Sequence, residues 1–353
     1  MDDSRKGLEA YGQAHQIAFA PLTFQAVRVA LDRGILATLQ RAGKAGRTRT
    51  EIAADTGFSL YAARVLLEGC LSVDVVALVE GEPRYRLTQT GFLLLRDPLV
   101  RANMRFVNDV CYRGAVDLER SLDEGRPAGL GTLGPWSTIY EGLSELPPAM
   151  QESWFGLDHL YSDAVFAQLL SHLLARRPRS LLDVGGNTGK WAVLCATSDP
   201  DIEITIVDHP GQLQKALARA TGAGVEARVR GEPMDLLDHA RPFPAGFDVV
   251  WMSQLLDCFP ETDIVRILRR GAEALSPTGT LYVLESYWDR QSNEVGRNVV
   301  TALSLYFACM ANGTSRMYHS DDLRECVSSA RLTIVEELEL GTHTLFACRP
   351  KSA

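Results

Sequence analysis

Acidic residues and glycines around position 185 are the residues of this sequence whose types and spacing most clearly suggest chemistry. The β-rich run 180–184 brings Asp183 to the end of a predicted strand, and a turn follows that contains Gly185, Gly186 and Gly189. Glycine lacks a Cβ, so such a turn accepts positive φ and lets a ligand approach the backbone closely. Ligands of α/β proteins bind beyond the carboxyl ends of parallel strands. The turn therefore predicts a ligand-binding loop.

Two further acids are expected at the same edge of the sheet. Asp208 ends the next β-rich run, ITIVD, and suits the hydroxyls of a ribose. Asp235 follows a third strand-like run and is placed to face an adenine. Such a glycine loop alone also fits NAD or FAD, but Asp183 before the glycines would repel a pyrophosphate and attract a cationic amino group. Acids that only form turns need not recur at three successive strand ends, so the set favours S-adenosylmethionine (SAM).

The loop needs a sheet to hold it, and the pattern from about residue 178 predicts one. Four β-rich segments, SLLDVG, IEITIVD, FDVVWMS and TLYVLES, alternate with segments of helical period. That alternation predicts a mostly parallel sheet covered on both faces. We therefore assign residues 166–353 to an α/β, Rossmann-like SAM-binding domain.

Residues 1–100 are predicted to form a mostly helical domain. A helix over 51–56 meets Gly57, and Ser59 is placed to cap a second helix that ends at Leu71. Two β-rich runs then flank residues 81–83, which is a hairpin signal. A helix-turn-helix followed by a hairpin predicts a winged helix. Residues 101–165, helical with a stretch rich in Gly and Pro, are expected to link the domains and to border the substrate.

A winged helix binds DNA or serves as a structural, dimerising unit. The candidate recognition helix LYAARVLLEGCL carries one basic residue, Arg64, whereas reading the major groove takes several. The formal net charge of −8 gives nucleic acid no electrostatic attraction.

The seven cysteines form no CxxC pair, the start of the chain lacks an apolar signal core, and no two histidines stand at i, i+4. No apolar run reaches the roughly 20 residues of a membrane span. We expect a cytoplasmic protein without metal, nucleic acid or membrane partners.

The order of these motifs resembles one family. A winged helix followed by LLDVGGNTG, VDHP, PMDLLD, FDVVWMSQLLDCFPETDIVRIL and GTLYVLE is similar to the small-molecule O-methyltransferases. These include plant caffeate and isoflavone enzymes, hydroxyindole O-methyltransferase and bacterial antibiotic-tailoring enzymes. The resemblance covers nearly the whole chain. It implies a homodimer joined through the N-terminal domains and methyl transfer from SAM to a small aromatic or phenolic acceptor.

Carried over by position, the resemblance also implies roles for individual residues. The three glycines would line the methionine and ribose of SAM, and Asp208 would bind the ribose hydroxyls. Asp235 and Leu236 would frame the adenine. Ser253 and Gln254, just after the fourth strand, would lie near the sulfonium.

One departure from the family falls on the catalytic base. The family usually has Leu-His-Asp-Trp where this chain has Leu256, Asp257, Cys258 and Phe259. The histidine takes the proton from the acceptor hydroxyl. An unperturbed Asp has a pKa of about 3.9 against about 6.5 for His, so Asp257 would need burial to act as a base near neutral pH.

Three explanations stay open. Asp257 is a base with a raised pKa, His159 or His319 supplies the base, or the acceptor needs none, as for a ring carbon ortho to a phenolate. Glu285 follows the fifth strand, where the family has an acid that orients its histidine, and is a further catalytic candidate. C-methylation is therefore the alternative to O-methylation.

The acceptor pocket is expected near two aromatic-rich segments. Its candidate residues are Tyr161, Met310, Asn312, Tyr318 and His319, although helical aromatic stripes are also typical of a packed core. Two other functions compete with methyl transfer. A SAM-binding regulator without catalysis would explain the missing histidine, and a nicotinamide dehydrogenase would use the same glycine loop.

Overall fold

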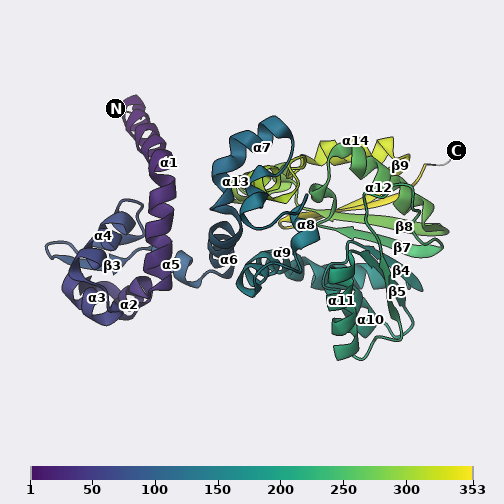
Figure 1. Cartoon of the computed structure of the whole chain (residues 1–353), viewed down its shortest axis with the longest axis horizontal. Coiled ribbons are helices and arrows are strands. Elements are labelled where there is room, and N and C mark those ends of the chain that lie inside the picture. Colours follow the sequence, from purple (N-terminus) through teal and green to yellow (C-terminus); the bar gives the residue numbers. More distant parts are fainter. Residues whose placement is uncertain (1, 352–353) are drawn as a thin grey trace. The chain divides into compact units, whose positions relative to one another are not determined.

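The computed structural model describes the backbone of residues 2–351 and the side chains of residues 7–162 and 165–351. The chain forms two compact units, residues 1–105 and 106–353 (Figure 1). The elements of the first unit are α1 (Asp2–Asp32), α2 (Ile35–Ala42), β1 (Arg47–Thr48), α3 (Arg49–Thr56), α4 (Leu60–Leu71), β2 (Val76–Leu78), β3 (Arg84–Leu87) and α5 (Gln89–Arg96), with α6 (Pro98–Phe106) at the boundary.

The first unit is the predicted winged helix. Gly57 ends α3 with φ at 72°, in the left-handed region that glycine accepts. The Ser59 hydroxyl then caps α4 by accepting a hydrogen bond from the Ala62 amide. The predicted hairpin is β2 and β3, which pair antiparallel and form a three-stranded sheet with β1. Arg64, the only basic residue of α4, pairs with Glu68, which leaves α4 without an unpaired positive charge for DNA.

The second unit begins with short helices and continues with a seven-stranded sheet. Its α-helices are α7 (Leu118–Glu124), α8 (Ile139–Gly142), α9 (Pro148–Leu174), α10 (Lys190–Ser198), α11 (Pro210–Gly222), α12 (Glu261–Glu273), α13 (Glu294–Tyr306) and α14 (Ser320–Ser329). Its strands are β4 (Ser180–Val184), β5 (Glu203–Asp208), β6 (Val229–Pro233), β7 (Phe247–Ser253), β8 (Leu275–Glu285), β9 (Leu332–Leu340) and β10 (His343–Pro350). Single helical turns lie at 107–111, 114–117, 128–132, 256–258, 288–290 and 307–311.

The strand order β6-β5-β4-β7-β8-β10-β9 is that of a Rossmann-like sheet with an added edge. The first five strands run parallel, as the sequence predicts. The last two form an antiparallel hairpin, which the alternation of strands and helices did not indicate. Because parallel strands end at the same edge, the residues after β4, β5, β6 and β7 lie close together.

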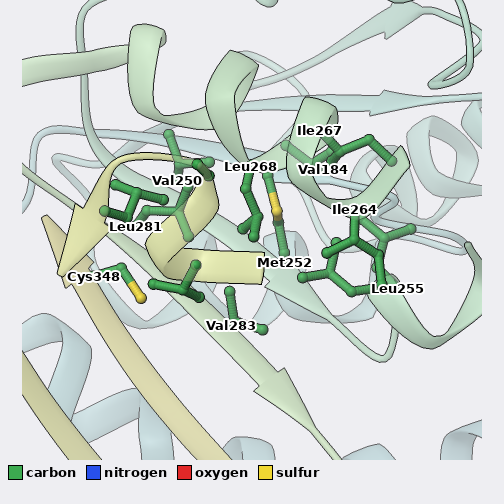
Figure 2. Close-up of a cluster of buried hydrophobic side chains, with 14 of the residues drawn as sticks. Val184, Val250, Met252, Leu255, Ile264, Ile267, Leu268, Leu281, Val283 and Cys348 are labelled. Atoms are coloured by element: carbon green, nitrogen blue, oxygen red, sulfur yellow. The ribbon is translucent and has the colours of Figure 1, made fainter. Parts of the chain in front are cut away.

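Both faces of this sheet are covered, and alternate residues of each strand supply the two cores. On one face, Val250 and Met252 of β7 pack against α12 and α14; Figure 2 shows them beside Ile264 and Leu268 of α12. On the other face, Trp251 of β7 packs against α9, α10 and α11. The helices of the two layers are visible on opposite sides of the strands in Figure 1. In the part of the chain that the structure describes, no helix is both long and apolar enough to cross a membrane.

Candidate active site

The glycine loop joins β4 to α10, and its geometry depends on residues without a side chain. Gly185 and Gly189 have φ of 71° and 72°, and Gly189 is the residue before α10. A Cβ on Gly186 would lie 2.7 Å from the Asp183 carboxylate, and one on Gly189 would lie 2.8 Å from Ala216 of α11. Gly186 therefore leaves room beside Asp183, whereas Gly189 allows two helices to approach each other.

A cavity of about 410 Å³ lies beyond the carboxyl ends of the strands. This volume falls within the usual range for small-molecule sites. Eight of the nine residues that the sequence assigned to SAM line it, namely Asp183, Gly185, Gly186, Asp208, Asp235, Leu236, Ser253 and Gln254. Gly189, the ninth, packs against α11.

The Asp183 carboxyl is buried at the floor of this cavity. Its side-chain group is 2 % exposed, and its Oδ2 has no hydrogen-bond partner within the described structure. Burial raises the pKa of Asp183 to about 8, and the charge of Asp208 adds to the shift. A buried carboxyl with an unused oxygen gains from a cationic group placed beside it. Asp183 therefore fits the amino end of a SAM molecule.

Asp208 fixes the glycine loop to β5. Its Oδ2 accepts a hydrogen bond from the Asn187 amide at 2.8 Å, and its Oδ1 accepts one from the His209 amide at 2.7 Å. Burial raises the pKa of Asp208, and these two amides oppose the shift. A carboxylate oxygen accepts more than one hydrogen bond, so both oxygens keep capacity for the two hydroxyls of a ribose.

A chain of hydrogen bonds crosses the cavity floor and involves residues that the sequence did not single out. His343 donates from Nε2 to Oε1 of Gln254 at 2.9 Å. Burial lowers the pKa of His343 to about 4, so this ring is neutral. Gln254 donates from Nε2 to Oδ1 of Asp158 at 3.3 Å, and Asn187 donates from Nδ2 to Oδ2 of the same aspartate at 3.2 Å. The chain joins β10, the end of β7, α9 and the glycine loop.

A second cavity, of about 110 Å³, adjoins the first. Five residues line both cavities, namely Tyr140, Trp154, Asp158, Gln254 and Cys258. The remaining wall is mostly aromatic or aliphatic and consists of Phe106, Leu157, Tyr161, Asp257, Ser286, Val300, Leu303, Tyr306, Phe307 and Met317. A small, mostly apolar cavity beside a larger and more polar one fits an acceptor ring beside a cofactor.

Asp257 is one of the two carboxylic acids, with Asp158, that line the smaller cavity. It lies in the helical turn 256–258. Burial raises the pKa of Asp257 to about 7, the Cys258 thiol opposes this, and the charge of Asp158 adds to it. The burial that a carboxylate base would need near neutral pH is thus present.

Glu285 holds the turn that carries Asp257. Its Oε1 accepts hydrogen bonds from the amides of Leu255 and Leu256 at 2.9 and 2.7 Å. The side chain is 2 % exposed, and burial, followed by the charge of Asp257, holds the pKa of Glu285 well above its usual range. Glu285 therefore contacts the backbone before Asp257 and is absent from the described lining of both cavities.

The other sequence candidates fall into two groups. His159 and Asn312 line the larger cavity and Tyr161 the smaller one; His159 contacts the Thr188 hydroxyl at 3.2 Å, and Asn312 donates to the Cys258 carbonyl at 2.7 Å. Met310, Tyr318 and His319 are absent from the described lining of both cavities.

Each of these three residues has a structural contact instead. The Met310 sulfur packs against Gly114 and Gly129. The Tyr318 hydroxyl donates to the Phe259 carbonyl at 2.7 Å. His319 caps α14 by accepting from the Asp321 amide with Nδ1. We therefore leave them out of the acceptor pocket proposed below. No three His, Cys, Asp or Glu side chains gather as around a metal ion within the described residues.

Two known protein families match this sequence, and they identify the chemistry of the site. A family model described as an O-methyltransferase domain matches residues 151–330, half of the chain, and one described as a Dimerisation2-like domain matches residues 12–85. The chain belongs to the O-methyltransferase family. It is a SAM-dependent methyltransferase, as the sequence predicts.

The individual relatives described next are each less than 30% identical to this chain. An L-tyrosine C(3)-methyltransferase of Streptomyces lavendulae is 27% identical over 89% of this chain and 84% of its own. A 3-amino-4-hydroxybenzoate 4-O-methyltransferase of Streptomyces cremeus is also 27% identical, over 92% and 86%. The solved structure of a mitomycin 7-O-methyltransferase superimposes with a TM-score of 0.75 at 21% identity and covers 99% of this chain and 100% of its own. That structure shows a shared fold.

Proposed function

We propose that this methyltransferase acts on a small phenol and that Asp257 takes the proton of the phenol hydroxyl. The observation that carries the proposal is the position of Asp257 in an aromatic-walled cavity that shares five wall residues with the cavity of the acidic strand ends. A ring in the smaller cavity presents its hydroxyl to a carboxylate and faces the cofactor.

The larger cavity would hold SAM along the strand ends. Asp183 would bind its amino group, Asp208 its ribose hydroxyls, and Asp235 with Leu236 its adenine. When bound, SAM supplies a methyl group activated by a sulfonium. The protein then has to align the acceptor oxygen with that methyl and to exclude water. Gln254, which lines both cavities, would border the path between them.

The proton step follows from the pKa of Asp257. A phenol has a pKa of about 10, so a carboxylate near 7 is a far better acceptor for its proton than an ordinary Asp near 4. The phenol O–H bond breaks and its proton passes to the Asp257 carboxylate. The oxygen pair then forms the new O–CH₃ bond as the S–CH₃ bond breaks, and the electron pair of that bond stays on sulfur, which leaves S-adenosylhomocysteine. Glu285 and Asn312 hold the backbone on either side of Asp257.

Methylation of a ring carbon is the second candidate. The same phenolate is nucleophilic at the carbon ortho to its oxygen. The new C–CH₃ bond forms there as the S–CH₃ bond breaks, and the carbon then loses its proton to water, which restores the aromatic ring. The observation in favour is the relative named for C(3) of L-tyrosine, 27% identical over 89% of this chain. Both outcomes need the phenolate that Asp257 would generate.

The test is a panel of phenols incubated with the protein and SAM carrying a ¹³C-labelled methyl. Mass spectrometry detects the transferred methyl, and NMR places it on oxygen or carbon. The expected result is a methylated phenol that is absent with boiled protein. If SAM binds in a calorimetric titration but no phenol gains a methyl, the proposal is wrong and a SAM-binding regulator becomes the better account.

The assembly that we propose is a homodimer through the first unit. Its helix α1 exposes large apolar side chains, with Leu8, Tyr11, Ile17, Phe19 and Leu22 each more than half exposed. Such an exposed apolar surface indicates a covered interface, and the matching family model is a Dimerisation2-like domain. Light scattering should give twice the chain mass of 38.8 kDa, whereas a monomer at micromolar concentration would contradict the proposal.

A further inference from the structure

Acidic side chains outnumber basic ones around the two cavities. Seven carboxylic side chains line them, and Lys190 is the one lysine or arginine among the described lining residues. Lys190 lies in the larger cavity, at the start of α10. The smaller cavity has two acids, Asp158 and Asp257, and no basic side chain in its described wall.

Apart from its two acids, the described wall of the smaller cavity is uncharged and mostly aromatic or aliphatic. Six aromatic side chains line it: Phe106, Tyr140, Trp154, Tyr161, Tyr306 and Phe307. Burial raises the pKa of Tyr140 and Tyr306 well above the usual range, so both hydroxyls stay protonated and neutral. Aromatic faces attract cations and repel anions. A carboxylate placed here would lose its water without gaining a cationic partner.

The volume of the smaller cavity limits the acceptor as well. It measures about 110 Å³, and a dry apolar cavity of about 150 Å³ holds one benzene ring. The smaller cavity therefore has space for at most one aromatic ring, and a second fused ring would have to extend into the larger cavity, which SAM would occupy.

We propose that the acceptor is a single-ring phenol that carries no anionic substituent, so that amine-bearing or neutral phenols are accepted and aromatic acids are rejected. This inference rests on the function proposed above. It separates this chain from relatives whose names specify a benzoate or a naphthoate.

Three phenols of nearly equal size test the charge selectivity: tyramine (cationic), 4-ethylphenol (neutral) and 4-hydroxyphenylacetate (anionic). Each is titrated by calorimetry into the protein saturated with S-adenosylhomocysteine, and each is then assayed for methyl transfer from SAM. We expect the acid to bind at least about tenfold more weakly than 4-ethylphenol, because of its repulsion by two nearby carboxyl groups. Tyramine should bind at least as tightly as 4-ethylphenol.

The Asp158→Asn variant tests where the selectivity originates. It removes one negative charge from the wall that both cavities share and keeps the size of the side chain. The affinity gap between 4-ethylphenol and the acid should narrow about threefold or more. Asp201→Ala, which removes an exposed acid paired with Arg179, is the matched control and should leave the gap unchanged. If Asp158→Asn does not fold, the wild-type titration alone decides.

The outcomes separate this inference from the proposed function. If the acid binds as tightly as 4-ethylphenol and is methylated, the phenol methyltransferase stands and the charge selectivity is wrong. If a two-ring naphthol is methylated faster than all three phenols, the size limit is wrong. If none of the phenols binds or gains a methyl although S-adenosylhomocysteine binds, both the function and the inference fall.

Discussion

The two cavities of the second unit differ in how the chain builds them. The walls of the larger cavity at the cofactor side come mainly from residues 183–263, where each strand ends at the same edge of the sheet. The smaller cavity collects residues from positions 106 to 317, on α6, α8, α9, α13 and the turn that carries Asp257. The residues of the larger cavity lie mainly at the ends of neighbouring strands, whereas the smaller cavity forms only when helices that are distant in sequence pack together.

This difference also separates polar from apolar recognition. At the strand ends, recognition is directional, because Asp208 accepts hydrogen bonds from the backbone amides of Asn187 and His209. In the smaller cavity, Asp257 is surrounded mostly by apolar side chains that provide shape. Substitutions in the first cavity should therefore change cofactor affinity, and substitution of Asp257 should change catalysis while cofactor affinity is kept.

Asp208→Ala should have the largest effect on the cofactor side. It removes the acceptor of two backbone amides as well as the proposed ribose contact. Each charge-assisted hydrogen bond contributes about 1.5–3 kcal/mol, so the affinity for S-adenosylhomocysteine should fall about 100-fold or more in a calorimetric titration. The exposed-acid variant Asp201→Ala should bind S-adenosylhomocysteine as tightly as the wild type does. If Asp208→Ala also binds it with unchanged affinity, the strand-end acids do not determine cofactor affinity.

Asp257→Asn should show the reverse pattern. The amide cannot take a proton, so kcat for methyl transfer should fall about 100-fold or more, the usual size of general-base catalysis. The affinity for S-adenosylhomocysteine should stay within about twofold. Asp257→His, which restores a base of pKa about 6.5, should recover part of the activity. If the variant loses cofactor affinity instead, Asp257 contributes to cofactor binding and not to catalysis.

Asp183→Asn should produce the smallest of these effects. Below pH 8 the Asp183 carboxyl of the free protein is protonated, and a cationic amino group favours its charged form, so binding releases a proton. The wild-type affinity for S-adenosylhomocysteine should therefore rise between pH 5 and 7.5, by at most about tenfold per pH unit. The variant should bind about tenfold more weakly at pH 7.5 and without this pH dependence. Equal pH dependence in both proteins would show that another group releases the proton.

The same raised pKa has a consequence for folding. The pKa of Asp183 lies at about 8 in the folded protein and near 3.8 when unfolded. The stabilisation by the protonated form is therefore complete below about pH 4 and is lost as the pH rises towards 8. Cofactor binding offsets this loss, because it pairs the charged carboxylate.

The difference between the two cavities explains which parts of the site the sequence could predict. The glycine loop and the acids of β4 and β5 are local signals, since strand period and glycine position fix where they lie. Met310 and Tyr318 were predicted as pocket residues because an aromatic-rich segment has the same sequence pattern whether it faces a core or a ligand. Asp158 and His343 gave no signal, because their partner Gln254 is distant in sequence. The β9–β10 hairpin was missed since it follows a different, antiparallel pattern.

The pH dependence of methyl transfer at saturating SAM and phenol tests the role of Asp257 most directly. The account predicts that the wild-type rate rises about tenfold per pH unit and levels off above about pH 7, where burial sets the pKa of this carboxyl. In Asp257→Asn the low residual rate should show no such inflection. The same inflection in both proteins would contradict the assignment of the base to Asp257.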